Sequence, residues 1–356
     1  MRNSMCDFLL GPLLKSVSRS FYLTLRVLPV DMRYPVGLAY LLARAADTIT
    51  DMPLIKPALR LKMLLRLRAY VNGEKYDCAL LHSITEQLAD QQRHPNEQLL
   101  LESIKPALEV LQQLSAFDRV AVRRIVLTLT RGMEFDLTTF PYERSGRIVA
   151  LCAWHELDQY TYMVAGCVGA FWTEMTYAYF PNALYGDPVI MTERAVCFGK
   201  ALQLTNLLRD CAKDLRIGRC YIPSSMLERY SLTPQDLLST DSAIRVLPII
   251  QELTRYALAQ FRDAINYMLA IRRSSTRLRL ACLWPIVIGL KTLFLLASST
   301  NYLVPELAVK MRRQHVYKII AVSIIFVNSN TLLRAWLERL ITATECQLYH
   351  ISSDRD

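Results

Sequence analysis

The segment from Leu202 to Pro223 constrains the fold most, because it puts polar side chains on one face of an otherwise apolar helix. Its sequence is LQLTNLLRDCAKDLRIGRCYIP. Two amides and two carboxylates recur in it at spacings of three and four residues, which share a helical face: Gln203, Asn206, Asp210 and Asp214. Leucines fill many of the positions between them, and carboxylates on such a helix are costly to bury unless they are paired or bind a metal. The segment therefore predicts a long helix with an acidic, oxygen-rich stripe.

A second carboxylate pair with the same spacing lies far upstream, in the sequence ARAADTITD at 43–51. Asp47 and Asp51 are four residues apart and follow apolar helical residues. Two helices that each present such a pair can face one another across a cavity and hold hard divalent cations. Mg²⁺ prefers oxygen ligands and completes its shell with water and substrate phosphates. These residues favour a metal–diphosphate site; the alternative is a network of ion pairs with Arg209 and Lys213 on solvated helix faces.

The composition is that of a helical protein with a large core. The chain has 356 residues, of which 52% are hydrophobic and only 11 are glycine. A net charge of +10 can attract acidic lipid, nucleic acid or phosphorylated small molecules. Nucleic acid is not an expected partner, because no basic–aromatic recognition motif or zinc-finger spacing is present. Nine cysteines without a CxxC motif predict reduced thiols in a cytosolic protein.

Apolar periodicity predicts helices along most of the chain, and no strand alternation is convincing. Helices are expected near 33–50, 58–70, 80–91, 96–114, 117–140, 157–169, within 202–223, near 233–239, 243–271, 276–298 and from about 313 to 346. The helix at 58–70 carries four basic residues, for which a solvated face above a leucine stripe is expected and contact with anionic lipid is the alternative: Arg60, Lys62, Arg66 and Arg68. The apolar runs 281–297 and 316–327 contain charged residues and fall short of a membrane span, so we expect buried core helices there.

Two further stretches carry candidate ligand contacts. In SVSRSF at 16–21, Ser18, Arg19 and Ser20 offer hydrogen-bond donors, and an arginine fork suits phosphate oxygens. A helix N-cap is the alternative for the serines. In the helical run at 157–169, the small residues Gly166 and Gly169 leave room beside the helix for another helix or for a ligand.

Five motifs together resemble, in the same order, those of the squalene and phytoene synthase family, the head-to-head prenyl synthases. They are SRSF at 18–21, YLLARAADTITD at 40–51, YTYMVAG at 160–166, QLTNLLRDCAKD at 203–214 and GRCYIP at 218–223. The resemblance spans most of the chain. It implies an all-α isoprenoid-synthase fold, with a single domain over residues 1–356 that forms a helical bundle around a central cavity.

The resemblance also implies roles for individual residues. Magnesium would be held by Asp47, Asp51, Asp210 and Asp214, with Asn206 close to both the metal and a cofactor. Tyr160 matches the catalytic tyrosine, and the four aspartates are catalytic through the metal. The prenyl diphosphate would contact Ser18, Arg19, Ser20, Phe21, Tyr40, Arg44, Val164, Gln203, Asn206 and Arg209.

The implied reaction condenses two farnesyl diphosphates into presqualene diphosphate, which NADPH then reduces to squalene. The sequence VKMR at 309–312 resembles a segment of squalene synthases whose basic residues contact the NADPH phosphates, so Lys310 and Arg312 are the expected contacts. Taken alone, the same residues are typical of a basic loop before a helix. The alternatives are a dehydrosqualene- or phytoene-type synthase without reduction, and a non-catalytic family member that acts as an assembly factor.

Two departures from the squalene synthase pattern bear on product and location. In ACLWP at 281–285, Ala281 stands where the family commonly has phenylalanine, and Trp284 is the nearest aromatic residue in sequence. The chain ends in SSDRD, without the carboxy-terminal anchor of eukaryotic squalene synthases. We therefore expect a cytoplasmic monomer that is soluble or bound peripherally to the inner membrane.

Overall fold

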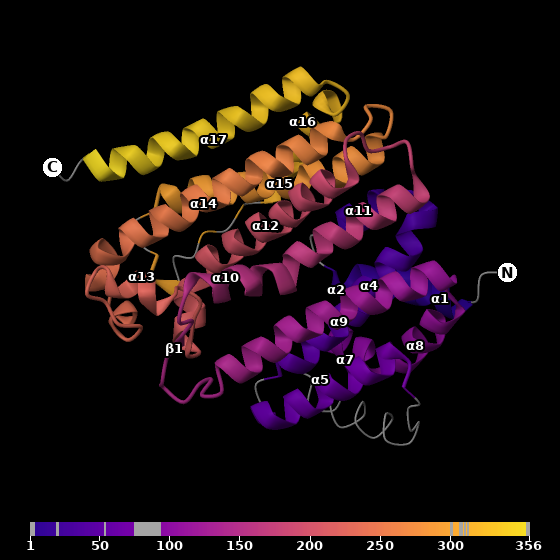
Figure 1. Cartoon of the computed structure of the whole chain (residues 1–356), viewed down its shortest axis with the longest axis horizontal. Helices are drawn as coiled ribbons and strands as arrows, with labels where there is room; N and C mark the ends of the chain where they lie inside the picture. Colours follow the sequence, from indigo (N-terminus) through magenta and orange to yellow (C-terminus); the bar gives the residue numbers. More distant parts are fainter. Residues whose placement is uncertain are drawn as a thin grey trace. The chain divides into compact units, whose positions relative to one another are not determined.

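Among the residues that the structure describes, the fold is helical apart from a very short two-stranded ladder and an isolated bridge between Leu184 and Ile271. The computed structural model describes residues 4–18, 21–52, 55–74, 94–299, 302–305, 309, 311 and 313–353. The chain groups into two compact units, Met1–Thr138 and Thr139–Asp356, and helices dominate both (Figure 1). The all-α fold class is confirmed, and the single-domain interpretation stays a prediction.

The first unit is organised by α4, which packs against α5, α7 and α8. Its helices are α1 (Ser4–Phe8), the π-helix η1 (Leu9–Leu13), α2 (Leu14–Val17), α3 (Phe21–Val27), α4 (Val30–Thr50), α5 (Pro57–Asn72), α7 (Pro95–Glu102), α8 (Ile104–Gln113) and α9 (Ala116–Thr139). The apolar positions of α4 recur at helical spacing and are buried, among them Leu38, Leu41, Leu42, Ala45 and Ile49. Their burial fixes which face of α4 is left for polar side chains.

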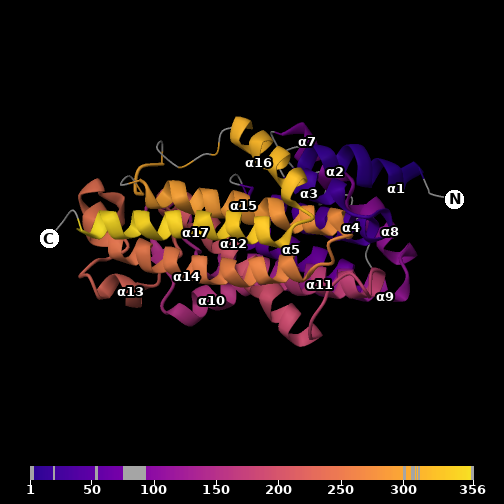
Figure 2. The same ribbon diagram turned by 90° about the horizontal axis from the view of Figure 1, so that it is seen from above.

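The second unit is organised by α12, which packs against α11, α14 and α15 (Figures 1 and 2). Its elements are β1 (Val149–Ala150), α10 (Trp154–Thr161), the π-helix η2 (Tyr162–Gly166), α11 (Cys167–Tyr179), α12 (Pro188–Arg216), β2 (Arg219–Cys220), α13 (Ser224–Glu228), the 3₁₀ turns η3 (Asp236–Leu238) and η4 (Thr240–Ser242), α14 (Ala243–Ala270), α15 (Thr276–Ala297), α16 (Arg313–Phe326) and α17 (Asn330–Ser353). Asp187 starts α12 as its N-cap, because its carboxylate accepts from the backbone N–H groups of Val189 and Ile190.

Glycines let α12 lie against η2 and α11 with almost no gap. A Cβ on Gly169 would lie 1.8 Å from the backbone oxygen of Ala195, and a Cβ on Gly199 would lie 2.2 Å from that of Ala165. Neither position tolerates a side chain without separating the helices. Of the two interpretations of the small residues at 165–169, another helix, and not a ligand, fills the room beside Gly169.

A parallel ladder of two residues per strand joins β1 to β2, with Val149 opposite Arg219 and Ala150 opposite Cys220. Strands this short give no alternating pattern in the sequence. Elsewhere some helix boundaries were predicted wrongly. The range 233–239 holds a single 3₁₀ turn, Asp236–Leu238. The range 96–114 breaks into α7 and α8 at Ser103, and the carboxy-terminal helix breaks between α16 and α17. The helix expected at 80–91 lies outside the described residues.

The burial of α15, α16 and α5 can be compared with the predictions for the apolar runs and for the basic helix. Among the described residues, α15 is the one helix long and apolar enough to cross a membrane, but 72% of its most apolar window is buried, as in a core helix. In α16, Ile324 and Ile325 are 59% and 74% exposed, so the expectation of a buried core helix is wrong for that face. The expected solvated basic face at 58–70 is wrong at Arg60, which is 3% exposed.

Candidate active site

The first aspartate pair lies at the carboxy-terminal end of α4. Asp47 occupies the last turn, and Asp51 is the C-cap, where its backbone N–H donates to the carbonyl oxygen of Asp47 at 2.9 Å. A helix C-terminus carries a partial negative charge, so it disfavours carboxylates and favours cations. Two carboxylates at this end therefore create a site that attracts positive charge.

Arg44 supplies part of that positive charge. Its guanidinium contacts the Asp47 carboxylate and, at 2.5 Å, Oε1 of Glu97 on α7. Desolvation works against the charged guanidinium, but Asp47, Glu97 and Tyr40 outweigh it and raise the pKa of Arg44. Desolvation also raises the pKa of Asp47, against the attraction of Arg44. The predicted face with Tyr40, Arg44 and Asp47 thus forms one electrostatic cluster.

A buried arginine that sequence analysis assigned to a solvated surface also supports this helix end. Arg60 on α5 donates from Nη1 to the backbone oxygen of Thr50 at 2.5 Å, ten residues away along the chain. Thr50 is the last residue of α4, so its carbonyl has no partner within the helix. Arg60 caps the helix that carries the first pair and places a fixed positive charge at its negative end.

The second pair lies near the carboxy-terminal end of α12. Gln203, Asn206, Asp210 and Asp214 all belong to this continuous helix and keep part of their surface accessible, whereas Leu204, Leu208, Cys211, Ala212 and Leu215 are buried. The helix therefore presents the predicted polar stripe away from its core. Arg209 holds Asp210 through two hydrogen bonds, from Nε at 3.1 Å and from Nη2 at 2.5 Å. Lys213 lies 3.8 Å from the same carboxylate.

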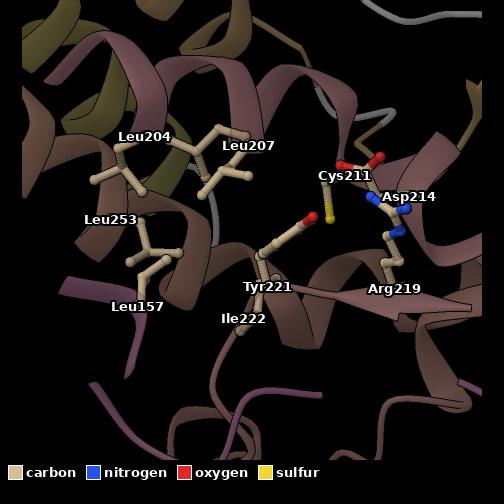
Figure 3. A pocket seen from close by; sticks show the side chains of 10 residues that line it. Leu157, Leu204, Leu207, Cys211, Asp214, Arg219, Tyr221, Ile222 and Leu253 are labelled. Atoms are coloured by element: carbon tan, nitrogen blue, oxygen red, sulfur yellow. The ribbon is translucent and has the colours of Figure 1, made fainter. Parts of the chain in front are cut away.

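Asp214 lines a pocket in the second unit that is mostly apolar (Figure 3). The empty volume is about 330 Å³, open solvent at its mouth included. Its walls are Leu157, Leu204, Leu207, Leu208, Cys211, Asp214, Arg219, Tyr221, Ile222 and Leu253. Figure 3 shows the side chains of Asp214 and Arg219 pointing toward one another at one end and the leucines at the other. Burial raises the pKa of Cys211, so its thiol is a neutral part of the wall at ordinary pH.

Tyr160 is buried beside a second tyrosine. It is 5% exposed and stacks on Tyr221, with ring centroids 4.9 Å apart and an interplanar angle of 25°. The two hydroxyl oxygens are 3.4 Å apart. Val164, half-buried, lies in the π-helix η2 that directly follows α10. A π-helical turn of this kind is frequent at functional sites.

The remaining predicted substrate and cofactor contacts either have another role in the structure or lie outside its described residues. The Ser18 hydroxyl is buried and donates to the carbonyl oxygen of Leu14 at 2.5 Å. Ser18 is the C-cap of α2, so the N-cap alternative is wrong for this serine. Phe21 begins α3, and its side chain is outside the described part of the chain. Arg19, Ser20, Lys310 and Arg312 also lie outside the described residues.

The donor set fits magnesium better than a soft metal. The carboxylates of both pairs and the Asn206 amide are hard oxygen donors. Within the described residues no group of three or more His, Cys, Asp or Glu side chains forms a ready-made metal cage. A Mg²⁺ site built from one or two carboxylates, water and substrate phosphate has no need of such a cage.

A family model described as "Squalene/phytoene synthase" matches residues 14–319, which include both aspartate pairs, Tyr160 and Tyr221. The chain belongs to the squalene/phytoene synthase family, the head-to-head prenyltransferases. The matched range includes parts of both units.

Two curated relatives and a solved structure are similar to this chain. The squalene synthase ERG9 of Saccharomyces cerevisiae is 26% identical over 307 residues, which cover 82% of this chain and 62% of that protein. The bifunctional lycopene cyclase/phytoene synthase of Arthroderma gypseum is 27% identical over 257 residues, 69% of this chain and 39% of that protein. The chain thus spans less than two thirds of either relative. The structure of TcSQS with the ligand BPH1237 has a TM-score of 0.71 at 20% identity, covers 98% of this chain and 99% of that chain, and shows the same fold.

Three residues of these clusters escaped the sequence analysis. Glu97 and Arg60 meet α4 only through tertiary packing, and no local pattern marks them. Tyr221 stood within the quoted GRCYIP motif without a role. The motif itself was the available signal.

Proposed function

We propose that this protein joins two farnesyl diphosphates head to head into presqualene diphosphate and then reduces this intermediate with NADPH to squalene. The observation that carries the proposal is the pair of carboxylates at the end of both α4 and α12, each beside an arginine on its own helix. The order of the family's motifs around these pairs supports the same assignment.

The carboxylates are the proposed magnesium ligands: Asp47, Asp51, Asp210 and Asp214, assisted by Asn206. Bound Mg²⁺ would neutralise diphosphate charge and so stabilise the leaving group. Arg44 and Arg209 each contact an aspartate in the structure, and each guanidinium has donors suited to diphosphate oxygens. Binding of substrate would therefore redistribute existing ion pairs between arginine, carboxylate and phosphate.

The first half-reaction forms a bond from C1 of one prenyl chain to the C2–C3 double bond of the other. One diphosphate and one proton leave, and a cyclopropyl diphosphate remains. We assign Tyr160 to the reacting end, where its phenol can donate a hydrogen bond to the departing diphosphate. Gln203, Tyr40 and Val164 are assigned to substrate contact, and the apolar surroundings of Tyr160 keep water from the cation.

The reduction rests on the sequence at 309–312. In this proposal Lys310 and Arg312 hold the phosphates of NADPH, which would supply the hydride as the second diphosphate leaves, and Asn206 lies near the cofactor. We also propose that the protein is soluble or bound peripherally to a membrane, which the burial of most of α15 supports.

Product analysis tests the proposal. Purified protein is incubated with farnesyl diphosphate and Mg²⁺, with and without NADPH, and the extract is identified by mass spectrometry. Squalene formed only with NADPH is the expected result. A dehydrosqualene or presqualene product that does not respond to NADPH would keep the condensation and remove the reduction. Absence of any head-to-head product with Mg²⁺ present would contradict the proposal and favour a non-catalytic assembly role.

A further inference from the structure

We propose that Tyr221 is the positioning residue for Tyr160, an inference that rests on the proposed function. Its side chain lies directly against that of Tyr160, which we assigned to the reacting end. The stack at 4.9 Å and 25° leaves the Tyr160 ring no freedom to tilt toward Tyr221. Tyr221 is itself 9% exposed, so both rings are fixed by their surroundings.

The backbone around Tyr221 is rigid for identifiable reasons. α12 ends at Arg216, and Gly218 follows with φ of +93°, a left-handed conformation that favours glycine. A Cβ on Gly218 would lie 2.7 Å from the carbonyl oxygen of Arg147. The ladder then fixes the next residues, because the N–H of Val149 donates to the Gly218 oxygen at 3.0 Å and the N–H of Leu151 to the Cys220 oxygen at 3.1 Å. Tyr221 comes directly after this ladder.

A third ring holds Tyr221 from another side. Phe140, 2% exposed, meets it edge to face, with centroids 5.2 Å apart and an angle of 73°. Tyr221 therefore packs against both Phe140 and Tyr160. It also lines the pocket that Asp214 lines (Figure 3). The conformation of the catalytic tyrosine is thereby tied to the end of the helix that carries the second aspartate pair.

The hydroxyl contact gives the pair a second use. A phenol has one proton to donate and can accept as well. At 3.4 Å the contact between the two hydroxyls is long for an O–H···O hydrogen bond, so its direction can reverse by rotation of the hydroxyl groups. When Tyr160 donates to a diphosphate oxygen, the Tyr221 hydroxyl can donate to Tyr160 and strengthen that bond. The ring stack fixes the position, and the hydroxyl makes a smaller contribution.

Steady-state kinetics of Tyr221→Leu, Tyr221→Phe and a control test this inference. Loss of the ring in Tyr221→Leu is expected to lower kcat by about 10- to 100-fold, as for a small misplacement of a reacting group, while KM for farnesyl diphosphate changes less than about twofold. Tyr221→Phe keeps the stack and is expected to restore kcat to within about fivefold of the wild type. Tyr221→Met replaces the leucine variant if that variant does not fold.

The matched control is Tyr267→Phe, which removes the hydroxyl of another buried tyrosine in the same unit, bonded to Thr173 at 3.0 Å. It is expected to lower the melting temperature and leave kcat unchanged. A folded Tyr221→Leu or Tyr221→Met with wild-type kcat overturns the inference, and so does a Tyr221→Phe as impaired as the ring-less variant, which would indicate direct chemistry. A wild-type protein that forms no head-to-head product would contradict the proposed function as well. This outcome can be told apart from failure of the Tyr221 inference, because the wild type is assayed before any variant.

Discussion

The two aspartate pairs occupy equivalent positions at the ends of long helices, but they are held by different means. At the end of α4, the cations and anions around Asp47 include residues from other helices, since Arg44 binds Glu97 of α7 and Arg60 of α5 caps Thr50. At the end of α12, the cations that contact Asp210 come from the same helix, Arg209 and Lys213. The first pair depends on tertiary structure, whereas the second is built mainly from local sequence.

This difference has consequences for substrate binding. At the end of α4, Arg44 and Glu97 are only 21% and 17% exposed, so solvent screens their ion pairs little. Arg209 and Lys213 are 36% and 49% exposed, so their attraction to Asp210 is screened by solvent. We expect the first pair to be the more preorganised and the second to exchange its partners more readily when diphosphate arrives.

The largest expected effect comes from removing one carboxylate of either pair. Asp47→Ala and Asp210→Ala are each expected to lower kcat by at least about 10²-fold, because the charge of the leaving diphosphate loses its electrostatic stabilisation. Turnover of farnesyl diphosphate measures this, with the exposed Asp241→Ala as the control. Wild-type turnover in one of the two variants would contradict a catalytic role for that pair, which would then be structural.

The next effect concerns the tertiary support of the first pair. Arg60→Leu is expected to lower the free energy of unfolding by about 2–3 kcal/mol, because the buried Thr50 carbonyl loses a charged donor. Urea denaturation measures it. Arg119→Leu is the control, since its hydrogen bond to the Gln112 carbonyl is exposed, and a change within about 0.5 kcal/mol is expected there. Equal changes in the two variants would mean that Arg60 does not support α4.

The support of α12 is steric. Gly199→Ala puts a methyl group 2.2 Å from the Ala165 oxygen, and we expect a loss of about 1–3 kcal/mol as the helices separate. Gly11→Ala, with no atom within 4 Å of the added Cβ, is the control. Thermal unfolding compares them. A Gly199→Ala protein as stable as the wild type would show that α12 and η2 can accommodate a methyl group between them.

The smallest expected effects compare an ion-pair partner from another helix, Glu97, with a partner from the same helix, Lys213. Glu97→Gln is expected to cost about 1–2 kcal/mol of stability, because Arg44 loses a charged hydrogen bond that is only 17% exposed on the glutamate side. Lys213→Ala is expected to change stability by less than about 0.5 kcal/mol, since the pair at 3.8 Å is screened. Reversal of this order would contradict the distinction between the two ends.

The sequence predicted what periodicity controls. The stripe from Gln203 to Asp214 and the pair at Asp47 and Asp51 follow from spacings of three and four residues in apolar helices, and their roles followed from the family motifs. The short helix expected at 233–239 was wrong, because seven residues carry too little periodic signal to separate a helix from 3₁₀ turns.

The support of the site lay beyond local pattern. Arg60 looks like one more base on a polar face, and only the fold turns it toward the carbonyl of Thr50. The stack of Tyr160 on Tyr221 joins residues that are 61 positions apart, so the sequence around either residue does not predict it. Contacts of this kind depend on the packing of whole elements, which a single sequence does not encode locally.

The most direct test of the central claim is the affinity for farnesyl diphosphate with and without Mg²⁺, measured by calorimetry on the wild type, Asp47→Asn and Asp210→Asn. Asparagine keeps the size of the side chain and removes its charge. The account predicts Mg²⁺-dependent binding in the wild type and a loss of at least about tenfold in each variant, as expected when a metal site is damaged. Binding that does not depend on Mg²⁺, or that is unchanged in both variants, would contradict the assignment of the two aspartate pairs to a metal–diphosphate site.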